Sequence, residues 1–114
     1  MNYKWRIFIA DLNPSQGSEQ RGKRPVLIVS DDHFNSLMPV VTVLPITSLK
    51  EGRKVYPNEA LLERGVGGLS QDSIALAHQI RTVSKQRLKE SPGSINDSNI
   101  QEAINGALRV HLNL

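Results

Sequence analysis

The loop at residues 17–24 carries the residue types best suited to chemistry on an anion. Its sequence, Gly-Ser-Glu-Gln-Arg-Gly-Lys-Arg, holds two glycines and three cations and leads into the apolar segment 26–29. Glycines let backbone N–H groups approach a ligand, and the planar fork of an arginine matches a phosphate. Pro25 disfavours the helical region for Arg24, so Arg24 is expected to be extended at the mouth of a strand. The loop predicts a phosphate site, with a merely solubilising loop as the alternative.

Three further motifs surround this loop in a fixed order. They are Asp-Leu-Asn-Pro at residues 11–14, Pro-Ile-Thr-Ser at 45–48, and Gln-Asp-Ser-Ile at 71–74 with Gln-Ile-Arg-Thr-Val at 79–83. In this order and spacing they resemble the motifs of the MazF/PemK/Kid family of toxin endoribonucleases from bacterial toxin–antitoxin pairs. The resemblance extends from about residue 7 to the last helix, and so covers nearly the whole chain.

The resemblance implies a function as well as a fold. It implies the toxin of a type II toxin–antitoxin system, a sequence-selective endoribonuclease that cleaves single-stranded RNA, including mRNA, and so inhibits translation and growth. It implies attack by the 2′-hydroxyl, giving a 2′,3′-cyclic phosphate and a 5′-hydroxyl, with no metal or other cofactor. The expected partners are RNA, a cognate antitoxin and a second copy of the chain, and the expected location is the cytoplasm.

Arg24 and Thr47 match the positions at which this family carries its catalytic arginine and threonine. Arg24 could donate two hydrogen bonds to the non-bridging phosphate oxygens, and the Thr47 hydroxyl could donate a third. An arginine is too basic to serve as a general base, so its expected role is electrostatic. The alternatives are that Thr47 caps the following loop and that Arg24 forms an ion pair with Asp11 or Glu19.

The proton-transfer group is less clearly marked. Some family members carry a histidine in the loop where this chain has Ser18, and others carry Arg and Asp where it has Leu76 and His78. His78 is a candidate replacement, with a hydrogen-bonded core histidine as the alternative. Glu19 is the rival base, and its alternative role is an ion pair with Arg21 or Lys23.

The charged loops supply the expected RNA contacts. Residues 1–57 carry eight Lys or Arg against five Asp or Glu, whereas residues 58–114 carry six of each, so the net charge of +3 lies in the first half. Aromatic residues make up only 4% of the chain, which argues against a broad stacking platform. The predicted RNA-binding residues are Asn13, Ser18, Gln20, Arg21, Lys23, Ser48, Lys50, Arg53, Lys54, Gln79 and Arg81.

Several classes of site are not expected. The chain has no cysteine, which excludes disulfides and thiolate metal sites and is compatible with the cytoplasm. Its three histidines are too scattered for a recognisable metal motif. No apolar run is long enough to span a bilayer, and the N-terminus lacks a signal-peptide pattern. The glycine cluster at residues 65–68 is not a dinucleotide fingerprint, because no strand–helix–strand unit surrounds it.

Hydrophobic periodicity predicts mostly β structure. The apolar patterns predict strands at residues 5–12, 26–29, 40–44, 57–62 and 73–80, with the first covered on both faces, and one acid-capped helical turn at 31–36. A stripe with helical spacing then runs through Ile100, Ala103, Ile104, Ala107, Leu108 and His111. Ser98 and Gln101 suggest a capping box at its start.

These elements predict a single α+β domain at residues 1–114. Its expected architecture is mainly antiparallel, a small curled sheet or SH3-like barrel of the CcdB/PemK type with a C-terminal amphipathic helix. The stripe at 100–108 is expected to be buried in a two-fold dimer interface. Two other functions fit such a fold: a non-catalytic poison like the related CcdB toxins, which trap DNA gyrase, and an RNA-binding barrel without activity.

Overall fold

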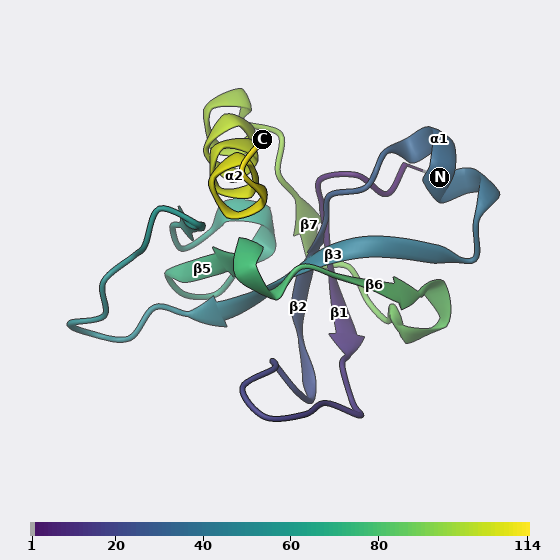
Figure 1. Ribbon diagram of the computed structural model, residues 1–114, viewed down its shortest axis with the longest axis horizontal. Helices are drawn as coiled ribbons and strands as arrows, with labels where there is room; N and C mark the ends of the chain where they lie inside the picture. Colours follow the sequence, from purple (N-terminus) through teal and green to yellow (C-terminus); the bar gives the residue numbers. More distant parts are fainter. Residues whose placement is uncertain (1) are drawn as a thin grey trace.

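The computed structural model, which describes residues 2–114, is a strongly curved antiparallel sheet with two α-helices (Figure 1). The strands are β1 (Arg6–Asp11), β2 (Lys23–Ile28), β3 (Val40–Ser48), β4 (Glu59–Leu62), β5 (Ser73–Leu76), β6 (Arg81–Ser84) and β7 (Gly93–Ser94). The helices are α1 (Asp32–Leu37) and α2 (Ser98–Leu112), with short 3₁₀ turns η1 (Val66–Gly68), η2 (Ala77–Gln79) and η3 (Lys85–Arg87). The predicted α+β class with a curled sheet and a C-terminal helix is confirmed.

The long strand β3 joins the two parts of the sheet. Along one edge it pairs with β2, and along the other it pairs first with β6 and then with β5. The strand order is therefore β4-β5-β3-β2-β1-β7, with β6 also paired to β3. The sequence placed the end of this strand at residue 44, but its pairing continues through the Pro-Ile-Thr-Ser motif to Ser48.

The strand predicted at residues 73–80 is wrong in its second half. Ile46 pairs with Ala75, whereas Val43 pairs with Arg81, so a step of three residues in β3 corresponds to six in its partner. The three extra residues form the 3₁₀ turn η2, closed by a hydrogen bond from Ile80 N–H to the Ala77 carbonyl. This bulge interrupts what would otherwise be one continuous strand and projects His78 out of the sheet.

Apolar side chains form a core on each face of the sheet. Ile7 and Leu27 belong to a core beneath α2, whereas Phe8 and Val26 belong to a second core with β6. Adjacent residues of a strand point to opposite faces, so β1 and β2 contribute to both cores. The prediction that the first strand is covered on both faces is confirmed.

Helix α2 covers one side of the sheet near β4 and η2 (Figure 1). Ile104 and Ala107 are buried in the first core, and Ile100 and Leu108 pack against it. The stripe is therefore used within the chain, and its proposed place in a dimer interface is wrong. The cap also differs from the prediction, because the Asp97 side chain accepts from Asn99 N–H and Ser98 is already helical.

Neither helix within residues 2–114 has the length and apolar character needed to cross a membrane. Each helix is capped at its N-terminus by an aspartate. Asp31 caps α1 by accepting from His33 N–H, which confirms the predicted acid-capped turn. His33 and the C-terminal His111 are both exposed, which agrees with their expected surface positions.

The glycine cluster at residues 65–68 allows η1 to pack against β7. A Cβ on Gly67 would lie 2.4 Å from Ile7 Cδ1, and one on Gly68 would lie 2.5 Å from the Pro92 carbonyl oxygen. From the other side, a Cβ on Gly93 would lie 2.8 Å from the carbonyl carbon and oxygen of Gly67. Three glycines thus permit a backbone-to-backbone contact that no side chain could enter.

We expect Gly93→Ala to lower the free energy of unfolding by about 1–3 kcal/mol, because the added methyl group meets rigid backbone. Gly106→Ala is the matched control: it lies within α2 with open space around it, so alanine should raise stability by about 0.5–1 kcal/mol. Urea unfolding of both variants measures the difference. Equal effects of the two substitutions would contradict the close approach of η1 and β7.

Candidate active site

Arg24 and Thr47 lie side by side at the ends of two paired strands. Val26 of β2 pairs with Pro45 of β3, and Arg24 and Thr47 are the next residues on the same face of these strands. Both side chains are half-buried, and both line a cavity of about 430 Å³ together with Lys23. The extended conformation predicted for Arg24 is confirmed by its place in β2.

The guanidinium of Arg24 faces this cavity without an acidic partner. Its Nε donates to the Arg21 carbonyl at 2.8 Å, and among residues 2–114 no carboxylate forms an ion pair with it. The alternative in which Asp11 or Glu19 neutralises Arg24 is therefore wrong. The Thr47 hydroxyl makes no hydrogen bond within residues 2–114, so it does not cap the following loop. Both groups are available to an anion.

This cavity is one end of a continuous groove. It shares Thr47, Ser48 and Lys50 with a second cavity of about 660 Å³. The second cavity shares further residues, His78 and Gln79 among them, with a third of about 330 Å³. The residues of the groove come from the loop before β2, the end of β3 and its following loop, η2 and β6.

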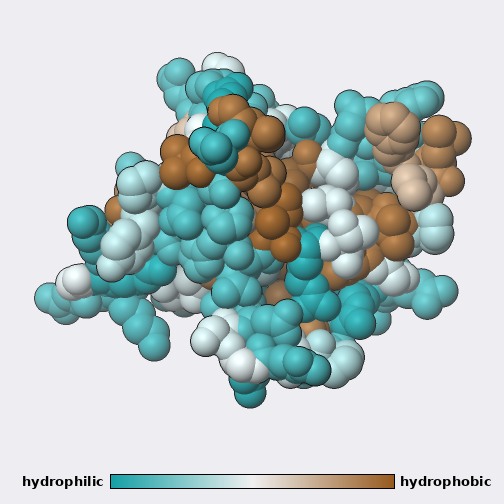
Figure 2. Space-filling view, in the orientation of Figure 1, coloured by the Kyte–Doolittle hydropathy of each residue, from teal (hydrophilic) through white to brown (hydrophobic). Residues whose placement is uncertain are grey.

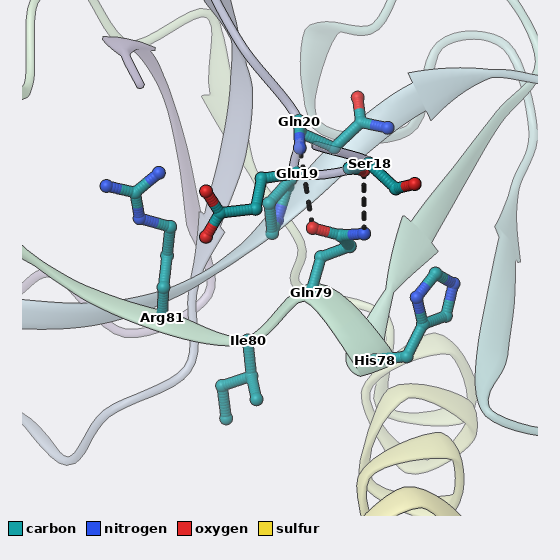
Figure 3. Close-up of a pocket in the computed structure, with 8 residues that line it drawn as sticks. Ser18, Glu19, Gln20, His78, Gln79, Ile80 and Arg81 are labelled. Carbon is teal, nitrogen blue, oxygen red and sulfur yellow. Dashed lines mark hydrogen bonds between the residues drawn. The ribbon is translucent and has the colours of Figure 1, made fainter. Parts of the chain in front are cut away.

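Gln79 ties the loop before β2 to η2 at the floor of the third cavity. Its Oε1 accepts from Gln20 N–H at 3.4 Å, and its Nε2 donates to the Ser18 carbonyl at 3.3 Å (Figure 3). Figure 3 shows His78 and Arg81 on opposite sides of Gln79. Gln20 Oε1 is buried without a hydrogen-bond partner among residues 2–114.

Glu59, at the first position of β4, is a functional residue that the sequence analysis missed. Its two carboxylate oxygens accept from Arg53 Nη1 and Nη2, each at 2.8 Å, in a bidentate pair. Oε1 also accepts from Tyr56 N–H at 3.0 Å, and Oε2 lies 2.9 Å from His78 Nε2. The only signal in the sequence was an acidic residue at the head of a buried apolar strand.

The Glu59 carboxylate is ionised because its surroundings favour the charge. The hydrogen bonds from Arg53 are the main cause of a pKa lowered to about 2, against the opposing effect of burial, and they raise the pKa of Arg53. Only 2% of the Glu59 side chain is exposed, compared with 32% of His78. His78 is therefore hydrogen-bonded, as one prediction held, but it is a surface residue and not part of the core.

Most of the predicted RNA-binding residues line the groove. Those present are Ser18, Gln20, Lys23, Ser48, Lys50, Arg53, Gln79 and Arg81, and the candidate base Glu19 lines the third cavity. Three others lie outside these cavities. Asn13 accepts from Gly22 N–H at 3.2 Å, Arg21 donates to the Gly17 carbonyl at 2.9 Å, and Lys54 lies beside the Tyr56 ring.

The alternative role of Glu19 is also wrong. Its carboxylate accepts from Gln16 N–H and forms no ion pair with Arg21 or Lys23. Within residues 2–114, no three His, Asp or Glu side chains are grouped closely enough to hold a metal ion. The reactive groups that line the groove are arginine, hydroxyl, carboxylate and imidazole groups.

Comparison with known proteins places these features in one family. Residues 3–112 match the PemK-like, MazF-like toxins of type II toxin–antitoxin systems. This chain belongs to that family. Over 108 residues it is 40% identical to the endoribonuclease MazF of Staphylococcus saprophyticus, a match that covers 95% of this chain and 88% of that protein.

Solved structures of PemK/MazF-like toxins share the fold. The Mycobacterium tuberculosis toxin MazF-mt6 gives a TM-score of 0.76 at 25% identity, over 96% of this chain and 97% of that chain. MazF of Deinococcus radiodurans gives 0.79 at 24% identity, over 97% and 96%. A mycobacterial endoribonuclease in complex with its cognate antitoxin gives 0.81 at 22% identity, over 100% and 97%. The family assignment made from the motifs is confirmed.

The depressed pKa of Glu59 predicts a dependence of stability on acid. A carboxyl group whose pKa falls from 4.5 to about 2 on folding stabilises the fold fully above pH 4.5 and loses that contribution as the pH falls towards 2. The loss should be about 3 kcal/mol. Urea unfolding in that pH window should show a flatter dependence for Glu59→Gln than for the wild type.

Glu102→Gln is the matched control for this measurement. Glu102 is 65% exposed and pairs with Arg109 on the surface of α2, so its removal should leave the slope unchanged. An acid dependence that is the same in Glu59→Gln and in the wild type would contradict the low pKa of Glu59.

Proposed function

We propose that this chain is the toxin of a type II toxin–antitoxin pair, an endoribonuclease that cleaves single-stranded RNA in the cytoplasm. The observation that carries the proposal is the joint exposure of Arg24 and Thr47 in one cavity of a groove lined by cations. Family membership and 40% identity to an endoribonuclease MazF support it. The RNA strand is held mainly by the charge of Lys23 and Lys50, which have no acidic partner among residues 2–114.

RNA supplies its own nucleophile, which explains why a metal is not needed in this mechanism. The 2′-hydroxyl oxygen attacks the adjacent phosphorus, and the bond from phosphorus to the 5′-oxygen breaks, leaving a 2′,3′-cyclic phosphate and a 5′-hydroxyl. Arg24 donates to the non-bridging oxygens, where negative charge increases in the transition state, and the Thr47 hydroxyl adds a further donor. Glu19 and His78 are the groove residues able to accept the proton of the 2′-hydroxyl.

The antitoxin and a second copy of the chain complete the proposed assembly. An acidic antitoxin segment would bind the same cations as RNA, so the two would exclude one another. Since the stripe of α2 is already buried, a dimer interface needs other apolar residues. Figure 2 shows hydrophobic surface over α2 and α1, where Val110, Leu112 and Phe34 are exposed. These patches support a homodimer.

A poison of the CcdB type is less well supported. A toxin that only traps another protein has no need of an arginine and a hydroxyl side by side in a cavity. A barrel that binds RNA without cutting it would use the cations but not this pair. RNA cleavage and RNA binding together separate all three functions.

We expect cleavage of RNA in the presence of EDTA, with products that carry a 2′,3′-cyclic phosphate and a 5′-hydroxyl. Replacing the ribose at the cut site by 2′-deoxyribose should abolish cleavage at that bond, because the nucleophile is removed. Mass spectrometry of the fragments identifies the ends. Cleavage of the deoxy substrate at the same bond would show that the mechanism is wrong, whereas binding without cleavage would favour the inactive barrel.

We expect Arg24→Lys to lower the single-turnover cleavage rate by about a hundredfold or more while retaining much of the affinity for RNA. Lysine keeps the charge but loses the planar fork that donates to two oxygens, and one such donor is commonly worth a factor of this size. Thr47→Val should cause a smaller loss, because a neutral hydroxyl contributes less than a charged donor. Arg109→Lys, on the surface of α2, is the control. An Arg24→Lys enzyme that cuts at the wild-type rate would exclude Arg24 from the active site.

A further inference from the structure

Tyr56 is an exposed aromatic residue just beyond the groove. Tyr56 is 52% exposed and lies in the loop between β3 and β4. Two cations flank the ring: the guanidinium of Arg53 lies 6.0 Å from its centroid and Lys54 Nζ lies 5.4 Å from it. Both cations lie over the ring in cation–π contact, and an exposed aromatic ring next to cations can stack an unpaired base while the cations bind its phosphate. The low aromatic content of the chain had argued only against a broad platform.

His78 lines the same cavity as Tyr56, and its Nε2 is held by Glu59. The two residues line a common cavity of about 580 Å³ with Arg53, Glu59 and Val110. Because Glu59 is ionised, its oxygens only accept hydrogen bonds, so the His78 Nε2 at 2.9 Å must donate. In the tautomer that carries its proton on Nε2, the lone pair of Nδ1 is an acceptor, and no group of residues 2–114 occupies it.

This cavity continues the groove of the active site. It shares Arg53 and His78 with the cavity of about 660 Å³ that Thr47 lines. An RNA strand whose phosphate lies at Arg24 and Thr47 can therefore extend past Lys50 to Tyr56.

We propose that Tyr56 and His78 form a nucleotide subsite next to the scissile phosphate. In it a base stacks on the Tyr56 ring while its exocyclic amino group donates to His78 Nδ1, which Glu59 orients. The ligand is a nucleotide with an exocyclic amine, such as adenine N6 or cytosine N4. Glu59 acts here as a positioning residue. This inference rests on the proposed RNA cleavage and adds a determinant of sequence preference.

RNA fits this surface better than a second copy of the chain or an antitoxin. The cavity shares Arg53 and His78 with the groove of the active site, and its lining combines the apolar surface of Tyr56, Pro57 and Val110 with the hydrogen-bonding groups of Asn58 and His78. The charged groups that face His78 are Glu59 of β4 and Arg53 of the preceding loop, with the His111 ring of α2 at 6.4 Å.

The test is a scan of RNA affinity with the full-length protein. After the wild-type cut site is mapped, an oligonucleotide with 2′-deoxyribose at that site serves as an uncleaved ligand, and each neighbouring nucleotide is replaced in turn by an abasic one. We expect one position at which the wild type loses about tenfold or more in affinity. At that position the abasic change should lower the RNA affinity of the Tyr56→Ala variant by about twofold or less, whereas Tyr56→Phe should lose as much affinity as the wild type. Phe34→Ala, at an equally exposed aromatic residue on α1, is the control.

The role of His78 has its own readouts. In the wild type, ¹⁵N spectra should show the proton of neutral His78 on Nε2, and Glu59→Gln should move it to Nδ1, because the amide can donate to Nε2. His78→Gln should lose the preference for the amino-bearing base over the same base without its amine. Glu102→Gln should change neither the position of the His78 proton nor the preference for the amino-bearing base.

Four results would overturn the subsite while leaving RNA cleavage established. The first is an abasic scan in which Tyr56→Ala matches the wild type at every position, and the second is neutral His78 with its proton on Nδ1. The third is loss of one limb of the pH–rate profile in His78→Gln with base preference intact. The fourth is a lower light-scattering mass for Tyr56→Ala. The third would assign proton transfer to His78, and the fourth would assign Tyr56 to a dimer interface. A wild-type protein that cuts no RNA would instead refute the proposed function itself.

Discussion

The shared strand β3 is the constraint on which the rest of the structure depends. One edge pairs with β2 and so brings Thr47 next to Arg24, while the other edge pairs with β5 and β6. Because the partner edge contains three more residues than β3 can pair with, η2 has to leave the sheet. The same strand thus brings Arg24 and Thr47 together on one side and exposes His78 and Gln79 on the other.

Glu59 is the second organising group, and it acts through hydrogen bonds instead of packing. All four of its contacts are donors from other parts of the chain: two from Arg53, one from the Tyr56 backbone and one from His78. A buried carboxylate without them would be strongly unfavourable, so the loop after β3 and the turn η2 are held to the start of β4. One ionised group therefore fixes the shape of the groove beyond Thr47.

The groove combines cations of two kinds. Arg53 is neutralised by a buried carboxylate and serves mainly to hold the site together, whereas Arg24 and the exposed Lys23 and Lys50 have no acidic partner among the described residues. Free cations attract a polyanion, and paired ones give the surface its geometry. The unpaired cations therefore lie in the groove although the net charge of the chain is only +3.

The sequence by itself determined the family, the curled sheet and the pair Arg24 and Thr47, because ordered motifs and the alternation of apolar residues are local properties of the chain. It did not determine the break at η2, since an apolar run such as 73–80 has the same period whether or not its partner strand is long enough to pair with it. Nor did it indicate Glu59, whose role depends on donors from two separate segments, the loop before β4 and the turn η2. Tertiary structure decided these features, because register and buried polar contacts are set by residues far apart in the chain.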